Sequence, residues 1–229
     1  MRVNYQKSFY NAAKAVSKIS NGLDNLSFPL DILEIISQDQ RIKLMTFNEF
    51  SNKTHTPHFQ ISSIFGSEDA FHIRKGNKAL IIYNDSLPMN RLRFTLAHEY
   101  GHFVMGHTGI NLNEHFTYED FYRRKAEEYE ANSFASCLLF PLHIRYQYLN
   151  CLDINKISKV FQISVQSSEI ALKVIKSHMN SGLDNYMSSN ENLHPKNYLL
   201  FLKESLDSHM DYINEFKYIY DLPVWLYYI

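Results

Sequence analysis

The segment from Phe94 to His102, Phe-Thr-Leu-Ala-His-Glu-Tyr-Gly-His, contains a His-Glu-x-x-His pattern that constrains both the local fold and the chemistry of the chain. On a helix, His98 and His102 lie one turn apart on one face, so both imidazoles can ligate the same zinc ion. Glu99 lies beside them and is not expected to be a ligand. Its carboxylate can take a proton from a water whose pKa the zinc lowers toward neutrality. The pattern therefore predicts a helix that carries a hydrolytic metal centre, unless the two histidines are ordinary helix residues.

A second segment can supply the ligand that this pattern lacks, because a catalytic zinc usually has three protein ligands. Residues 127–141, Glu-Glu-Tyr-Glu-Ala-Asn-Ser-Phe-Ala-Ser-Cys-Leu-Leu-Phe-Pro, are typical of a helix that ends at Pro141. Glu128 and Asn132 lie one turn apart on a stripe that becomes apolar further along. We assign Glu128 as the third ligand and Asn132 as a residue that orients a ligand imidazole. Two alternatives stay open: Glu128 is a solvated charge, or Glu130 is the ligand.

These two segments resemble the ImmA/IrrE family of zinc metallopeptidases. The resemblance rests on the run Arg-Phe-Thr-Leu-Ala-His-Glu-Tyr-Gly-His from Arg93 and on Glu-Tyr-Glu-Ala-Asn-Ser-Phe-Ala-Ser-Cys-Leu-Leu-Phe-Pro from Glu128. It implies that His98, His102 and Glu128 bind zinc and that Glu99 is the base. Members of the family are bacterial, phage or mobile-element proteins, and several relieve repression by cleaving, or triggering the cleavage of, a helix-turn-helix repressor.

The resemblance covers roughly residues 75 to 145. It implies a zinc-dependent endopeptidase of the gluzincin type whose substrate is a protein partner, a helix-turn-helix repressor of a phage, mobile element or stress response encoded nearby. Tyr100 departs from the family pattern, which commonly has an aliphatic residue there. Neither an amino-terminal DNA-binding domain nor a cysteine zinc ribbon is evident, so a DNA-binding partner is expected to be a separate chain.

Two other functional classes compete with the enzyme. The first is a non-proteolytic regulator that uses its metal site for binding or folding and acts by docking on a protein partner. Glu99 favours the enzyme over this class, because metal binding alone does not need a base. The second is a DNA-binding regulator, which would use two short helices predicted between Ile154 and Ser177 as a helix-turn-helix. We prefer the alternative in which these helices close the core, because no arginine cluster accompanies them.

Composition excludes several further classes. The chain has 229 residues, of which 45% are apolar, and a formal net charge of −1. Nothing in this balance favours a polyanion partner or an anionic membrane, and no apolar run approaches the ~18 residues of a membrane span. Only Cys137 and Cys151 occur, so neither a disulfide framework nor a cysteine zinc pair is expected. We expect a cytoplasmic protein and leave its oligomeric state open.

The patterning along the chain predicts an α+β fold: a helical zincin-like core with a small antiparallel or mixed sheet, helix-turn-helix-like helices, and a helical C-terminal tail. Residues 5–37 suit two helices, 41–47 a strand, and 71–75 with 78–83 a hairpin, whose turn is Gly-Asn. The expected domain divisions are a metallopeptidase core (1–150), the helix-turn-helix-like segment (151–177), and a linker with an aromatic-rich tail (178–229).

Two further expectations concern the substrate. Residues 79 to 84 would lie near it if they formed an edge strand to which a peptide can add, and the alternative is a strand covered on both sides. His107, His115, Tyr118 and Tyr122 are candidates to stabilise an oxyanion, from the polar connection at 108–121 and its borders. His107 is expected to be structural, because the metzincin pattern requires a third histidine six residues after the second.

Overall fold

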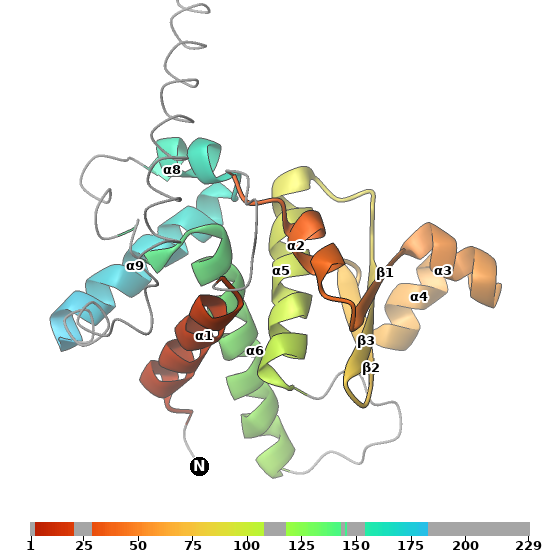
Figure 1. Ribbon diagram of the computed structural model, residues 1–229, viewed down its shortest axis with the longest axis horizontal. Coiled ribbons are helices and arrows are strands. Elements are labelled where there is room, and N and C mark those ends of the chain that lie inside the picture. Colours follow the sequence, from red (N-terminus) through yellow and green to blue (C-terminus); the bar gives the residue numbers. More distant parts are fainter. Residues whose placement is uncertain (1–2, 21–28, 108–117, 143–144, 146–153, 183–229) are drawn as a thin grey trace, which may run out of the picture.

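A computed structural model of the chain describes residues 3–20, 29–107, 118–142, 145 and 154–182 (Figure 1). Along the chain these residues form α1 (Tyr5–Ser20), α2 (Ile32–Gln38), β1 (Ile42–Thr46), α3 (Phe47–Thr54), α4 (His58–Phe65), β2 (Ala70–Lys75), β3 (Lys78–Tyr83), α5 (Met89–Met105), α6 (Tyr118–Leu139), α8 (Ile154–Phe161) and α9 (Val165–Ser181). The predicted α+β class is confirmed. The expected tail lies outside the described residues.

The three strands form one mixed sheet in the order β1-β3-β2. β1 runs parallel to β3, whereas β2 and β3 form an antiparallel hairpin that closes with the pair Lys75 and Lys78. Gly76 in the two-residue turn has a φ of 61°, the positive value that tight hairpin turns require and that glycine adopts without strain. The first predicted strand and the hairpin are therefore confirmed.

β3 is the central strand of the sheet, because β1 pairs with one of its edges and β2 with the other. The expectation of a free edge at residues 79 to 84 is therefore wrong, and the alternative of a strand flanked on both sides is the one found. β2 is the edge strand that packs against α5. Its Arg74 donates from Nη1 to the carbonyl oxygens of Phe103 and His107, at 3.4 and 3.3 Å.

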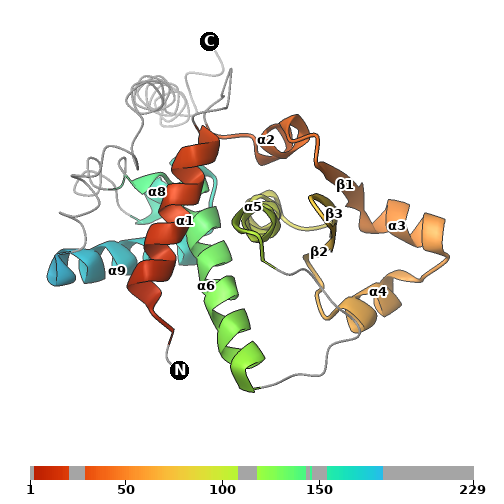
Figure 2. The ribbon, with the colours of Figure 1, turned by 60° about the horizontal axis from the view of Figure 1, so that its bottom comes forward.

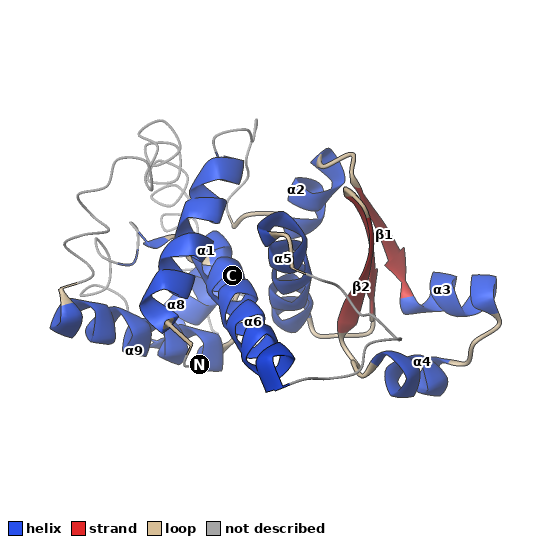
Figure 3. Ribbon diagram, turned by 90° about the horizontal axis from the view of Figure 1, so that it is seen from below, coloured by secondary structure: helices blue, strands red, loops and turns tan. Residues whose placement is uncertain are grey.

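The two faces of the sheet contact different layers. Ala79 and Ile81 join the main core with α5, whereas Phe71 and Ile82 face a smaller apolar cluster that contains Phe47 of α3. Figure 2 shows the result: α5 lies between α6 and the sheet, and α3 and α4 lie beyond the sheet. Figure 3 shows the same layers from another side. Because side chains alternate along each strand, the sheet presents apolar residues on both faces, and each face packs against its own cluster.

Helices α3 and α4 were not predicted. α3 begins with a capping box, in which the Thr46 hydroxyl accepts from the Glu49 N–H at 3.1 Å and the Glu49 carboxylate accepts from the Thr46 N–H at 2.9 Å. The Thr-x-x-Glu spacing was the sequence signal that could have located this helix. The helices predicted within residues 5–37 are confirmed as α1 and α2.

α5 and α6 approach each other closely at Gly101. A Cβ atom on this residue would lie 2.9 Å from Cδ1 of Phe134 on α6, closer than side-chain atoms pack. α6 begins nine residues before the predicted start at Glu127 and ends at Leu139, two residues before Pro141. α6 crosses the face of α5 that holds the His-Glu-x-x-His segment, with Glu128 and Phe134 at the contact, and α1 lies along the outer side of α6 (Figure 2).

The two helices predicted between Ile154 and Ser177 are confirmed as α8 and α9. Ile157, Val160 and Phe161 of α8 are buried in the same apolar cluster as the inner residues of α5 and α6. This packing is what the core-closing alternative predicts. None of the helices in the described ranges is long and apolar enough to cross a bilayer.

Candidate metal centre

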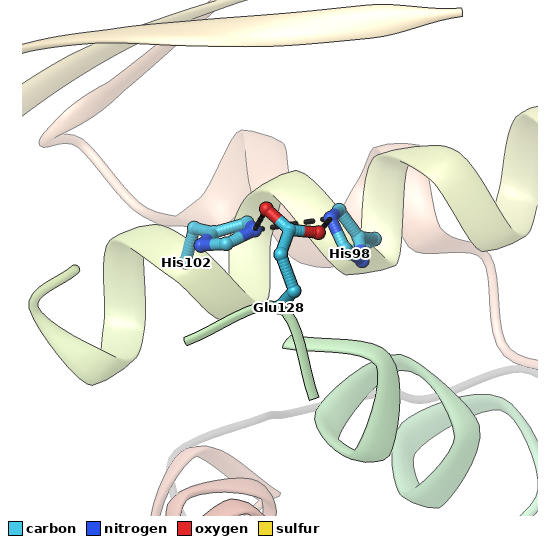
Figure 4. A group of neighbouring side chains, drawn as sticks. All are labelled: His98, His102 and Glu128. Atoms are coloured by element: carbon cyan, nitrogen blue, oxygen red, sulfur yellow. Dashed lines mark hydrogen bonds and ion pairs between the residues drawn. The ribbon is translucent and has the colours of Figure 1, made fainter. Parts of the chain in front are cut away.

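Three of the predicted site residues converge between α5 and α6. The Nε2 atoms of His98 and His102 are 3.0 Å apart, and each lies 3.4 Å from an oxygen of the Glu128 carboxylate. Figure 4 shows the two imidazoles on α5 and the carboxylate from α6 pointing toward one another. Among the described residues, these side chains form a group whose ligand atoms all lie within 4.8 Å of one another.

The local structure explains the convergence. The four-residue spacing on α5 stacks the two imidazoles on one face of the helix. α6 then passes close enough for Glu128 to reach between them, because Gly101 carries no side chain at the crossing. His102 is buried, whereas the Glu128 side chain is 60% exposed. The donor set is therefore held by the helices on one side and open to solvent on the other.

The electrostatics of the group favour cation binding. The adjoining imidazoles of His102 and His98 hold the pKa of the Glu128 carboxyl well below its usual range. Burial lowers the pKa of His102. At His98, burial opposes protonation, but the hydrogen bond to Glu128 and the nearby Glu99 outweigh it and raise the pKa. The ionised Glu128 carboxylate and the imidazole of His102 therefore offer lone pairs that a metal ion can share, whereas at His98 a metal ion has to compete with a proton.

Asn132 lies one helical turn after Glu128 and reaches the outer nitrogen of His98. Its Oδ1 is 3.1 Å from Nδ1 of His98. An amide oxygen can only accept, so Nδ1 is the donor and Nε2 of the neutral ring keeps its lone pair toward the group. The structure thus places Asn132 against His98, one of the two imidazoles that it could have oriented according to the sequence.

Glu130, the alternative third ligand, is not part of the three-residue group. Its Oε2 is 3.0 Å from Nε2 of His107, and Nδ1 of His107 is 2.9 Å from Nδ1 of His102. His107 is buried, which fits the structural role expected for it. Of the other candidates for oxyanion stabilisation, His115 and the side chain of Tyr118 lie outside the described residues.

Glu99 faces a pocket that the metal-site residues also line. This pocket has a volume of about 470 Å³ and is lined by His98, Glu99, His102 and Glu128, by Phe65, Gly66, Ser67, Ala70, Phe71 and His72, and by Arg124 and Glu127 of α6. The last oxyanion candidate, Tyr122, is not among these lining residues.

His72 is the residue at this site that the sequence argument missed. It lies on β2, its side chain is 5% exposed, and its Nδ1 is 2.7 Å from Oε2 of Glu99. A single histidine on a strand gives no sequence signal of such a contact, because 27 residues separate the two partners. One feature could have drawn attention to it: His72 occupies a position of the hairpin that would otherwise be apolar and inward-facing.

The fold and the site define a class of protein: an α+β protein whose metal-binding group lies between two helices and opens on a pocket beside a buried carboxylate, as in metal-dependent peptidases. The family model of the IrrE N-terminal-like domain (Peptidase_M78) matches residues 53–173. The chain belongs to this family of metallopeptidases. No curated protein matches the chain. The matched range includes β2, both helices of the metal-binding group, and α8.

Proposed function

We propose that this protein is a zinc-dependent endopeptidase that hydrolyses a peptide bond in a protein partner, a helix-turn-helix repressor encoded nearby. One observation carries the proposal: Glu99 and the group formed by His98, His102 and Glu128 line the same open pocket. A protein that only binds a metal would need no more than the three-residue group. A carboxylate beside it, outside the group and facing the same space, is what hydrolysis additionally requires.

The donor set fits zinc. Two imidazole nitrogens and one carboxylate oxygen are a common protein set for catalytic zinc, with a fourth position left for water or substrate. Zn–N bonds of ~2.0–2.1 Å in a tetrahedral site place neighbouring ligand atoms ~3.3 Å apart. The two Nε2 atoms are 3.0 Å apart, each lies 3.4 Å from a different oxygen of Glu128, and with one atom taken from each residue all separations are within 4.8 Å. His98, His102 and Glu128 would hold the ion, which when bound lowers the pKa of a water and polarises a carbonyl.

Glu99 moves the protons in this proposal. Its carboxylate accepts a proton from the attacking water and then delivers it to the nitrogen of the leaving peptide. Because Glu99 is buried and one of its oxygens is occupied by His72, the other oxygen is the one available for this transfer. A carboxylate fixed in this way needs little reorganisation during the reaction.

The substrate peptide would lie along β2 as an added strand. The pair Lys75 and Lys78 closes the hairpin, and the Asn84 N–H donates to the Asp69 carbonyl at 2.8 Å, so odd-numbered residues of this strand bond to β3. The N–H and C=O groups of the even-numbered residues, among them His72, then point away from β3. Main-chain hydrogen bonds to this edge would align an extended peptide beside Glu99.

Glu99→Gln tests the proposed chemistry. With zinc and the neighbouring repressor as substrate, the variant should lose cleavage by at least ~100-fold, since a general base contributes that much or more. Its zinc content, measured by atomic absorption, should equal that of the wild type. Glu169→Gln, an exposed carboxylate change on α9, is the matched control and should cleave normally.

Two outcomes would contradict the proposal. Cleavage by Glu99→Gln at the wild-type rate would exclude Glu99 as the base. If the zinc-loaded wild type binds the repressor without cutting it, and Glu99→Gln binds equally well, the protein acts by docking. The non-proteolytic regulator would then replace the enzyme.

A further inference from the structure

His72 combines two features that are not explained by packing alone. Its Nδ1 is 2.7 Å from Oε2 of Glu99, and its Nε2 is buried without a hydrogen-bond partner among the described residues. A buried polar atom with no partner destabilises the folded protein. A leucine at this position would avoid that cost and would suit the face of β2 that packs on the main core. Among the described residues, the bond to Glu99 is the only hydrogen bond that the His72 ring makes, so this bond is what offsets the stability penalty of the histidine.

The geometry fixes the direction of that contact. A carboxylate can only accept, so the Nδ1 of His72 is the donor and Oε2 of Glu99 the acceptor. The bond is short, and both side chains are nearly excluded from solvent, with exposures of 5% and 11%. A charge-assisted hydrogen bond of this length in a low-dielectric setting holds the carboxylate in one orientation.

The position of His72 on β2 explains why it can act as a fixed support. It pairs with Ile81 of the central strand, so its backbone is held by the hairpin. Its ring also stacks on that of His102, with centroids 5.4 Å apart and planes at 26°. The strand pairing of the backbone and the stacking on His102 together restrict the rotation of the His72 imidazole. Glu99 is thereby fastened to the sheet as well as to α5, its own helix.

We infer that His72 is a positioning residue for Glu99: its Nδ1–H occupies Oε2 and leaves Oε1 directed at the pocket. This inference rests on the proposed hydrolytic function, because it assigns Glu99 a task that needs a defined orientation. His72 does not contribute to the three-residue metal group, so its role is separate from metal binding.

Two substitutions of nearly equal shape separate positioning from packing. His72→Asn keeps an N–H donor at the place of Nδ1, whereas His72→Leu has the same branched skeleton without a donor. Positioning predicts that His72→Leu lowers kcat about 10- to 100-fold with KM within about twofold, the size of effect that a misplaced catalytic group produces. His72→Asn should recover most of kcat. A packing role predicts the reverse order, because leucine fills an apolar site better than asparagine.

Zinc affinity is the first control on these variants. Competition with a chromophoric chelator should give both variants the wild-type affinity within about twofold. A large loss in His72→Leu would mean that the metal site itself is disturbed, and would overturn the inference. Equal kcat values for the two variants, whether normal or reduced, would overturn it as well.

A measurement independent of cleavage distinguishes failure of this inference from failure of the proposed function. Nitrogen-15 spectra of the histidine rings, assigned with His72→Asn, should show a proton on Nδ1 of His72 at neutral pH. The Nε2–H tautomer would overturn the positioning role even in an active enzyme. A Nδ1–H tautomer in a protein that cleaves nothing would leave the hydrogen bond intact and discard the hydrolytic function.

Discussion

His107 and His102 face each other through their Nδ1 atoms, which are 2.9 Å apart. A nitrogen that ligates a metal carries no proton. With its Nε2 in the metal group, His102 therefore has its proton on Nδ1, and this N–H donates a hydrogen bond to Nδ1 of His107. His107 in turn has its proton on Nε2, which lies 3.0 Å from a carboxylate oxygen of Glu130. This series of hydrogen bonds, from Glu130 through His107 to His102, therefore sets the tautomer of a ligand imidazole from outside the metal group.

This arrangement predicts that His107 and Glu130 tune metal affinity. His107→Phe and Glu130→Met, which removes the acceptor and keeps the length of the side chain, should each weaken zinc binding about 10- to 100-fold, the usual effect of removing a partner that orients a ligand. The measurement is chelator competition at pH 7. The exposed change Glu169→Gln should leave the affinity unchanged. Unaltered affinity in both site variants would show that His102 keeps its tautomer without this series of hydrogen bonds.

Asn132 allows a matched test at the other imidazole. Asn132→Leu retains the shape of the side chain and removes the acceptor for Nδ1 of His98, so zinc affinity should fall by about tenfold. Asn132→Asp keeps an acceptor and adds charge, so it should bind zinc at least as tightly as the wild type. Because Asn132 is exposed, neither variant should unfold at a lower temperature than the wild type by more than a few degrees. Equal affinities for the two variants would contradict a role for the Asn132 oxygen.

The buried phenol of Tyr100 is expected to make the folded protein less stable at alkaline pH. Burial, with the nearby Asp39 carboxylate, raises the pKa of its phenol to about 12. The ordinary pKa is ~10, so the unfolded chain loses this proton first as the pH rises. The neutral phenol therefore contributes stability that is complete below about pH 10 and is lost between about pH 10 and 12.

Tyr100→Phe removes this titration and keeps the edge-to-face contact with Phe134. Between about pH 8 and 11 the wild type should lose ~1.4 kcal/mol more unfolding free energy than the variant. Urea unfolding at the two pH values measures the difference, and the other tyrosines cancel in the comparison. Parallel losses in the two proteins would show that Tyr100 ionises as freely in the fold as outside it.

Arg93 joins three elements through its buried guanidinium. It donates from Nη1 to the Leu30 carbonyl at 2.8 Å, and from Nε and Nη2 to the carbonyls of Gln162 and Phe161 at 3.2 and 3.4 Å. Arg93→Leu should leave these acceptors without a donor and destabilise the protein by about 2–4 kcal/mol. Arg91→Leu, an exposed change on the same helix, should have a far smaller effect. Urea unfolding compares the two, and equal stabilities would contradict the role assigned to Arg93.

The sequence located the candidate metal-binding group because its signals are local. A four-residue spacing on a helix decides by itself that His98 and His102 share a face. Glu128 and Asn132 obey the same period on the second helix, so each helix could be assigned separately and the chemistry then linked them. The packing of the two helices determines the pocket that these residues share and the distances between them. The residues themselves could be identified without knowledge of that packing.

The neighbours of these residues could not be found in the same way. His72 reaches Glu99 across 27 positions, and His107 reaches Glu130 across 23, and no periodicity relates the partners. The order of the strands posed the same difficulty. Each strand was predicted from its own residues, but whether 79–84 lay at an edge depended on where the distant β1 paired.

The sequence by itself therefore determined the chemical groups that this protein brings to its candidate metal centre, because those groups are specified by spacing within single helices. Only the tertiary structure decided which atoms of those groups are available. It turns Nδ1 of each imidazole toward Asn132 or His107, and it fixes one oxygen of Glu99 against β2. The physical reason is that hydrogen-bond direction depends on contacts between separate elements, and these form only when α5, α6 and the sheet pack together.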